Sequence, residues 1–185
     1  MRKEYQILLL AGLLANFGDN LIGPFYAVFV ENIGGSILDI GYSVVTYSIA
    51  AGVLIILIGK LSDKIDKRII TILGYLLFAF GSLGYLMISE PIQLFGLQII
   101  FALATACLSA PLSALYARYI AEESAGLQWG LSSGGTYIVV GFAVLAGTFI
   151  VSQWGFTYLF LIMFSIQIFA AAVQTQLYLC AEQEI

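Results

Sequence analysis

Long apolar segments separated by short polar breaks run along the whole chain, and each segment is long enough to form a bilayer-spanning helix of about 20 residues. The predicted spans cover residues 5–30, 38–60, 68–89, 92–118, 126–152 and 156–180. Ser36, followed by Asp39, matches a capping box that opens the second span. Because the breaks are short, consecutive helices should pack as antiparallel neighbours. The pattern predicts an all-α membrane protein in which residues 1–185 form a single bundle of six transmembrane helices.

The composition agrees with this pattern and excludes several kinds of chemistry. Of the 185 residues, 61% are hydrophobic and 10% are charged, whereas soluble domains carry about 25% charged residues. The chain has no histidine, and Cys107 and Cys180 have no CxxC spacing, so neither a metal site nor a cofactor is expected. No nucleophile with a neighbouring base is found, so an enzyme is not predicted. The net charge of −4 argues against nucleic acid as a partner.

Basic residues fix the expected orientation in the membrane, because short cytoplasmic loops are rich in lysine and arginine. All seven basic residues fall on one side of the predicted topology: Arg2, Lys3, Lys60, Lys64, Lys67, Arg68 and Arg118. We therefore expect both termini to face the cytoplasm, with the plasma (inner) membrane as the location and the lipid bilayer as the surroundings.

Two equal spacings hint at an internal repeat. Pro24 and Pro111 are separated by the same number of residues as Arg68 and Gly155, which begin the third and sixth spans. Three helices followed by three of opposite entry direction form a 3+3 inverted repeat, which is common in secondary transporters. Helices of equal length would give similar offsets without a repeat, so both explanations stay open.

The polar stretch at residues 59–68, Gly-Lys-Leu-Ser-Asp-Lys-Ile-Asp-Lys-Arg, resembles the signature loop between helices 2 and 3 of the major facilitator superfamily. The matching or charge-conserving positions are Gly59, Leu61, Asp63, Lys64, Lys67 and Arg68, while Asp66 stands where the family has glycine. The resemblance implies a conformational latch of Gly59, Asp63 and Arg68, with Asp63 facing the opposite half of the transporter. The alternative is a basic loop that only fixes topology, which explains the lysines but not the Gly-x-Leu-x-Asp spacing.

The resemblance extends over the chain as the N-terminal six-helix half of a normal member, since residues 19–24 and 152–156 are also similar to family patterns. It implies secondary-active transport of a small solute by alternating access. It also implies a second six-helix half, from a second copy, another chain, or sequence lost by truncation. Proton-coupled drug exporters have an arginine in helix 4 where this chain has Gln98 or Ile99, which argues against a proton-driven multidrug antiporter. The rival function is a non-transporting assembly subunit or the inert remnant of a split transporter.

Asp19 is the only acidic residue deep inside a predicted span, about 18 Å from the start of the apolar run at Ile7. A carboxylate at that depth costs about 2.5–3.5 kcal/mol on insertion scales, so it should line a cavity or find a partner. Asn16 and Asn20 lie on the same helix face. The three residues form either a substrate or proton site, or a hydrogen-bonded cluster that holds helices together.

The fourth span carries a comparable polar face made of Gln98, Thr105 and Ser109, with Arg118 toward the cytoplasm. In the family that this chain resembles, helices 1 and 4 line the central cavity, so these residues should meet Asp19 there. Arg118 has a second interpretation as an anchor that reaches to the membrane interface.

Overall fold

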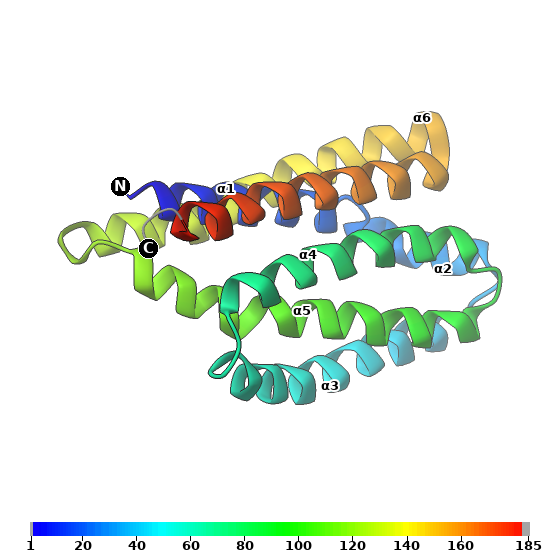
Figure 1. Cartoon of the computed structure of the whole chain (residues 1–185). Helices are drawn as coiled ribbons and strands as arrows, with labels where there is room; N and C mark the ends of the chain where they lie inside the picture. The colour runs from blue at the N-terminus through cyan, green and yellow to red at the C-terminus, as the bar shows by residue number, and fades with distance from the viewer. Residues whose placement is uncertain (1, 183–185) are drawn as a thin grey trace.

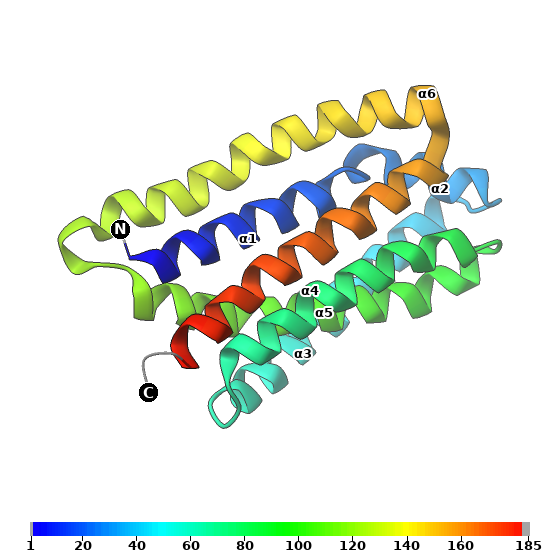
Figure 2. The same cartoon turned by 45° about the horizontal axis from the view of Figure 1, so that its top comes forward.

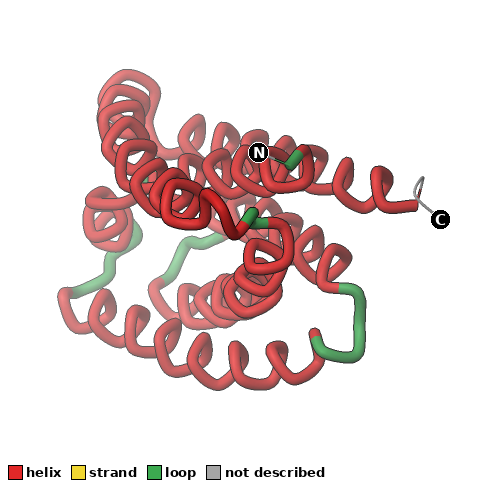
Figure 3. The backbone as a smooth tube through the Cα atoms, turned by 90° about the vertical axis from the view of Figure 1, so that its left-hand side faces the viewer, coloured by secondary structure: helices red, strands yellow, loops and turns green. Residues whose placement is uncertain are grey.

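The computed structural model describes residues 2–182, with side chains to residue 179, and within that part every regular element is a helix (Figure 3). The α-helices are α1 (Lys3–Asn20), α2 (Tyr26–Asn32), α3 (Ile37–Ser62), α4 (Lys67–Gly84), α5 (Pro91–Tyr119) and α6 (Ala125–Glu182). Short 3₁₀ turns lie at Gly23–Phe25, Tyr85–Met87 and Glu122–Ser124. Five helical stretches are long and apolar enough to cross a membrane. The all-α membrane fold predicted from the sequence is therefore confirmed.

The long helix α6 contains one break, at Gly155. This residue has φ 79° and ψ −176°, a conformation that glycine reaches without a side-chain penalty. The chain reverses direction there, as the turn from yellow to orange in Figure 2 shows. We call residues 125–154 the first arm of α6 and residues 156–182 its second arm. The predicted break between residues 152 and 156 coincides with this turn.

The first predicted span is interrupted, which differs from the continuous helix expected over residues 5–30. After α1 ends at Asn20, a 3₁₀ turn with Pro24 in its first positions leads into α2. Proline lacks a backbone N–H, and its ring crowds the carbonyl four residues earlier, so the helix breaks there. Pro111 lies inside α5 without ending it, so the two prolines have different local effects.

The helices turn at two opposite ends of the bundle. The N-terminus, the C-terminal end of α6, the α3–α4 turn and the α5–α6 turn lie at one end, at the left in Figure 1. The other turns lie at the opposite end. All seven basic residues are therefore near the end with the termini, as the topology required. The side of the membrane that this end faces stays a prediction.

The predicted capping box opens α3. Ser36 donates from its backbone N–H to Asp39 Oδ2 at 2.7 Å, and the Asp39 N–H donates back to Ser36 Oγ at 3.4 Å. Together the two bonds satisfy backbone donors that a helix start otherwise leaves free.

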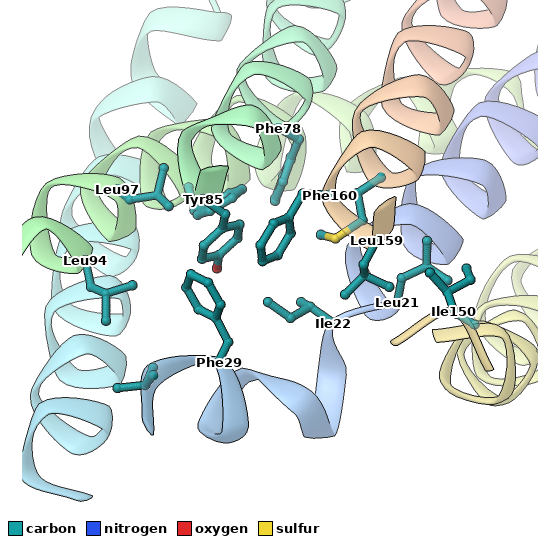
Figure 4. Packing of buried hydrophobic residues seen from close by; sticks show 14 of the residues in the cluster. Leu21, Ile22, Phe29, Phe78, Tyr85, Leu94, Leu97, Ile150, Leu159 and Phe160 are labelled. Atoms are coloured by element: carbon teal, nitrogen blue, oxygen red, sulfur yellow. The ribbon is translucent and has the colours of Figure 1, made fainter. Parts of the chain in front are cut away.

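Aromatic side chains close the bundle at the end opposite the termini. Phe29 of α2, Tyr85 after α4 and Phe160 of the second arm pack together, with ring centroids 4.8–5.3 Å apart (Figure 4). Such aromatic pairs add about 0.5–1.5 kcal/mol to the effect of burying the rings. A second apolar cluster near the termini includes Tyr5, Tyr75 and Leu177. These clusters hold the helices around the space in which the candidate site lies.

Small residues set the closest helix contacts. α1 packs along α6, α3 along α5, and α4 along both α5 and α6. Gly147 of the first arm lies against the backbone just after α1, where an added Cβ would overlap the carbonyl of Leu21. Gly59 of α3 lies near Ala110 of α5, and a Cβ there would be 3.5 Å from the alanine methyl. Glycine at such points lets membrane helices approach closely.

Candidate substrate cavity

A cavity of about 410 Å³ lies inside the bundle, and four of the predicted site residues line it together. Asn16 and Asp19 reach it from α1, and Thr105 and Ser109 reach it from α5. The expectation that the polar faces of these two helices meet at one cavity agrees with this geometry. Tyr47 of α3 and Trp129 of the first arm border the same space.

A second cavity of about 250 Å³ continues from the first toward the end opposite the termini. Asp19, Tyr47 and Phe78 line both cavities, so the carboxylate lies where they join. The predicted residue Gln98 lines this second cavity together with Tyr26.

The Asp19 carboxylate has no protein partner among the described residues. Its side chain is exposed to the cavity, and neither an ion pair nor a hydrogen bond to it occurs in that part of the chain. Asn16 and Asn20 donate instead to backbone carbonyls of their own helix, Gly12 at 2.8 Å and Asn16 at 2.9 Å. Asn20 lines neither cavity. Within residues 2–179 the three polar side chains therefore make no hydrogen bond between helices.

Tyrosine hydroxyls tie the surrounding helices together. Tyr47 Oη and Thr105 Oγ1 are 2.9 Å apart and join α3 to α5. Gln98 Nε2 donates to Tyr26 Oη at 2.8 Å, and that hydroxyl is 2.7 Å from Ser43 Oγ. Sequence reasoning missed Tyr26, because an aromatic residue near a span end is ordinary in membrane helices.

Two buried polar groups at the first cavity also lack partners. Tyr75 is 0% exposed and Gln167 is 1% exposed, and neither Tyr75 Oη nor Gln167 Oε1 has a hydrogen-bond partner in the described part of the chain. Gln167 Nε2 does donate to the Ala15 carbonyl at 3.0 Å. Sequence reasoning missed both residues, although Gln167, a polar residue near the middle of the last apolar segment, was an available signal.

Comparison with known proteins gives the family. The family model of the Major Facilitator Superfamily matches residues 8–181. The chain belongs to the major facilitator superfamily. It is a membrane transporter rather than an enzyme, as the sequence had indicated.

Two relatives of this superfamily member are moderately similar in sequence. It is 27% identical to an uncharacterized MFS-type transporter YitZ of Bacillus subtilis (strain 168), over 72% of this chain and 82% of the relative. It is 26% identical to a chloramphenicol resistance protein of Pseudomonas aeruginosa, over 77% of this chain and 34% of that relative. The chain thus spans about a third of the length of the second relative.

The superfamily signature loop lies at the end with the termini and borders a hollow of about 520 Å³. Asp63 caps the end of α3, its side chain is 79% exposed, and Lys67 Nζ is 3.8 Å away. Arg68 does not pair with Asp63, because its guanidinium donates to both oxygens of Asp66 at 2.6–3.0 Å. Asp66, which stands where the family has glycine, therefore holds Arg68, the arginine of the motif.

Asp66 also caps the start of α4. Its Oδ1 accepts from the backbone N–H of Arg68 at 2.9 Å, which satisfies a free donor of the first turn. The hydrogen bond and charge of Arg68 hold the pKa of the Asp66 carboxyl below its usual value. Because the pKa is lowered in the folded protein, this stabilisation is present at neutral pH and is lost as pH falls through the lowered pKa.

Arg118 lies at this loop and not at the central cavities. It borders the same hollow as Asp63 and Asp66 and lines neither of the other two cavities. The reason is distance along the helix, since Arg118 follows Ser109 by nine residues and so lies about 13 Å further along α5. Its guanidinium is 5.6 Å from the centroid of the Tyr119 ring. This placement agrees with the alternative role as an anchor at the membrane interface.

Proposed function

We propose that this chain carries out secondary-active transport of a small solute by alternating access, and that the solute binds in the cavity at Asp19. The observation that carries the proposal is the unpartnered carboxylate where the two cavities join. An uncompensated charge inside a membrane bundle is costly and typically marks a substrate or ion pathway. A solute or proton that enters the cavity would offset that cost. Asn16, Gln98, Thr105 and Ser109 complete the proposed site.

We further propose that the two arms of α6 are separate spans, which gives six helices in a 3+3 inverted repeat. Equivalent contacts between the two halves support this proposal. Gly147 of the first arm packs on the chain end of α1, and Gly59 of α3 packs on α5. In the same way Gln167 of the second arm bonds to α1, and Gly74 of α4 packs on Leu108 of α5. The first helix of one half, α1, therefore contacts both arms of α6, which are the second and third helices of the other half. In the same way α5, the first helix of that other half, contacts α3 and α4.

A second six-helix bundle is proposed to cover the open side of the cavity. Asp19 and Trp129 are exposed there, between α3 and the first arm of α6. The flanking helices carry exposed apolar side chains, such as Ile56 at 74% and Leu145 at 68%. Lipid would suit these apolar faces but not a carboxylate. A second bundle would cover both the carboxylate and the apolar faces. It could be a second copy of this chain or another half-transporter, with the same orientation in the membrane.

Flux into proteoliposomes tests the transport function. The reconstituted chain should move at least one solute from a panel of small organic cations, anions and neutral compounds, under an imposed solute or proton gradient. Chloramphenicol belongs in the panel because one relative is named for resistance to it. Protein-free liposomes are the control, and particle mass in mild detergent shows whether bundles pair. If no solute moves under any gradient, the non-transporting subunit becomes the better account.

The latch role of the signature loop is a separate proposal, with its own prediction. Asp63→Asn keeps the side-chain size and all seven basic residues, so membrane insertion should stay normal. Transport should fall several-fold, because the exposed carboxylate would no longer meet a helix end of the opposite bundle. Flux and the fraction of paired bundles measure the effect. Lys64→Gln is the matched control, because it removes one charge at the neighbouring residue. If it lowers transport as much as Asp63→Asn does, a general effect of charge explains the result better than a latch.

A further inference from the structure

We propose that the solute bound at Asp19 is a protonated organic amine with an aromatic or other apolar body. The inference rests on the transport function proposed above and names the chemical class of its substrate. Three features of the cavity carry it: the isolated negative charge, the aromatic walls, and the buried oxygen atoms without a partner.

The charge of the cavity favours a monovalent cation. Among the described residues, Asp19 is the only acidic residue that lines either cavity, and neither lysine nor arginine lines them. The basic residues lie near the end with the termini, so no described residue of this bundle neutralises the carboxylate in the cavity. An anion would be repelled, and a neutral solute would leave the charge uncompensated. A cation both binds the carboxylate and removes the cost of keeping it in the bundle.

The walls favour an organic cation over an inorganic ion. Tyr47 and Phe78 line both cavities together with Asp19, while Trp129 adds to the aromatic lining of the first cavity and Tyr85 to that of the second. Aromatic faces attract ammonium groups and pack well against apolar bodies. Metal ions need several oxygen ligands, and no group of three or more acidic or cysteine side chains that could hold a metal ion occurs in the described residues. The larger cavity, about 410 Å³, lies in the size range of sites for small organic ligands.

The unpartnered oxygens favour a cation that carries N–H groups. Gln167 packs beside Gly18, the neighbour of Asp19, and uses its Nε2 to bond Ala15. Its Oε1 remains free in the described structure and can only accept a hydrogen bond. Tyr75 Oη also lacks a partner at this cavity. A buried acceptor without a hydrogen bond is unfavourable, so a cation that donates N–H hydrogen bonds fits better than one that cannot.

Binding measured on the purified full chain in mild detergent tests the proposal. Trp129 lines the cavity, and Trp154→Phe removes the only other tryptophan, so fluorescence in this background reports on the site. The probes are 4-phenylbutylammonium, the neutral alcohol 4-phenylbutanol, and the trimethylammonium form of the amine, which has no N–H. We expect saturable binding of the amine, and binding of the alcohol weaker by about tenfold or more.

Matched variants separate the contributions. Asp19→Asn should weaken the amine by about tenfold or more, whereas Glu31→Gln should change nothing, because Glu31 is an exposed carboxylate on α2 outside both cavities. Gln167→Leu should weaken binding of the amine but not binding of its trimethylammonium form. Size-exclusion profiles must show each variant folded. Equal effects of Gln167→Leu on both cations would overturn the N–H contribution.

Two results would overturn the amine class: equal affinity of the wild-type protein for amine and alcohol, or an unchanged affinity in Asp19→Asn. The assay does not depend on transport. If the amine binds at Asp19 but no solute moves in proteoliposomes, the transport function is wrong and the binding class stands. If neutral or anionic solutes are moved and the amine does not bind, the transport function stands and the amine class is wrong.

Discussion

Replacing Asp19 with asparagine should abolish both exchange and uphill accumulation of the transported solute in vesicles. The amide keeps the size of the side chain but removes a negative charge that no other described residue at the cavity supplies. A cationic solute would then lose its main partner, so binding and every later step should fail together. Exchange and accumulation are measured side by side at equal protein content, with Glu31→Gln as the control for removal of a carboxylate elsewhere.

Other outcomes of the same experiment assign a different role to the residue. If exchange survives while accumulation is lost, Asp19 carries a coupling proton, because the amide mimics the protonated acid. If Asp19→Asn is tolerated but Asp19→Leu damages folding and transport alike, the residue holds helices together. Unchanged accumulation in Asp19→Asn would end the proposal that Asp19 belongs to the transport site.

The positions of the helices could be predicted because bilayer crossing requires long apolar runs, and breaks between such runs are visible in a single sequence. The ends of α3 and α5 lie within two residues of the predicted limits. The interruption of the first span at Pro24 was not predicted, since a proline can break a helix, as here, or lie inside one, as Pro111 does. The difference depends on how neighbouring helices satisfy the freed backbone groups, which the sequence does not show.

The candidate site was predicted in part, for a related reason. Hydropathy shows the depth of Asp19 and Thr105 in their spans, and the helical period shows which residues share a face. It does not show which face of another helix lies opposite. Tyr75 and Gln167 therefore came only from the structure, which buries both beside the cavity. Arg118 was grouped with the polar face of its helix, although its position near the helix end places it with the signature loop.

The signature loop illustrates what a resemblance alone leaves open. The resemblance implied a latch made of Gly59, Asp63 and Arg68, and the residue types match. The substitution of glycine by Asp66 changes the local pairing, because a carboxylate two residues before Arg68 both caps α4 and holds the guanidinium. Asp63 keeps an exposed side chain. Any contact with an opposite bundle would therefore depend on Asp63 itself, with Arg68 already engaged within its own loop.

Replacing Gly147 with alanine should destabilise the bundle more than the same change at any other glycine of the first arm of α6. An added Cβ would overlap the backbone carbonyl of Leu21, and backbone cannot move aside as a flexible side chain can. Overpacking of this kind costs about 1–3 kcal/mol or more. It would also push α6 away from the segment that follows Asp19, so transport should fall with stability. Unfolding in a titration with a denaturing detergent, followed by circular dichroism, measures the loss.

Gly141→Ala is the matched control for this prediction, because it adds the same methyl group six residues earlier on the same arm. A Cβ there meets nothing within 4 Å, and alanine is favoured over glycine within a helix by about 0.5–1 kcal/mol. The control should therefore unfold at the same or a higher detergent fraction than the wild-type protein, and the Gly147 variant at a clearly lower one. Equal midpoints for both variants would mean that the first arm does not pack as closely on the end of α1 as the structure shows.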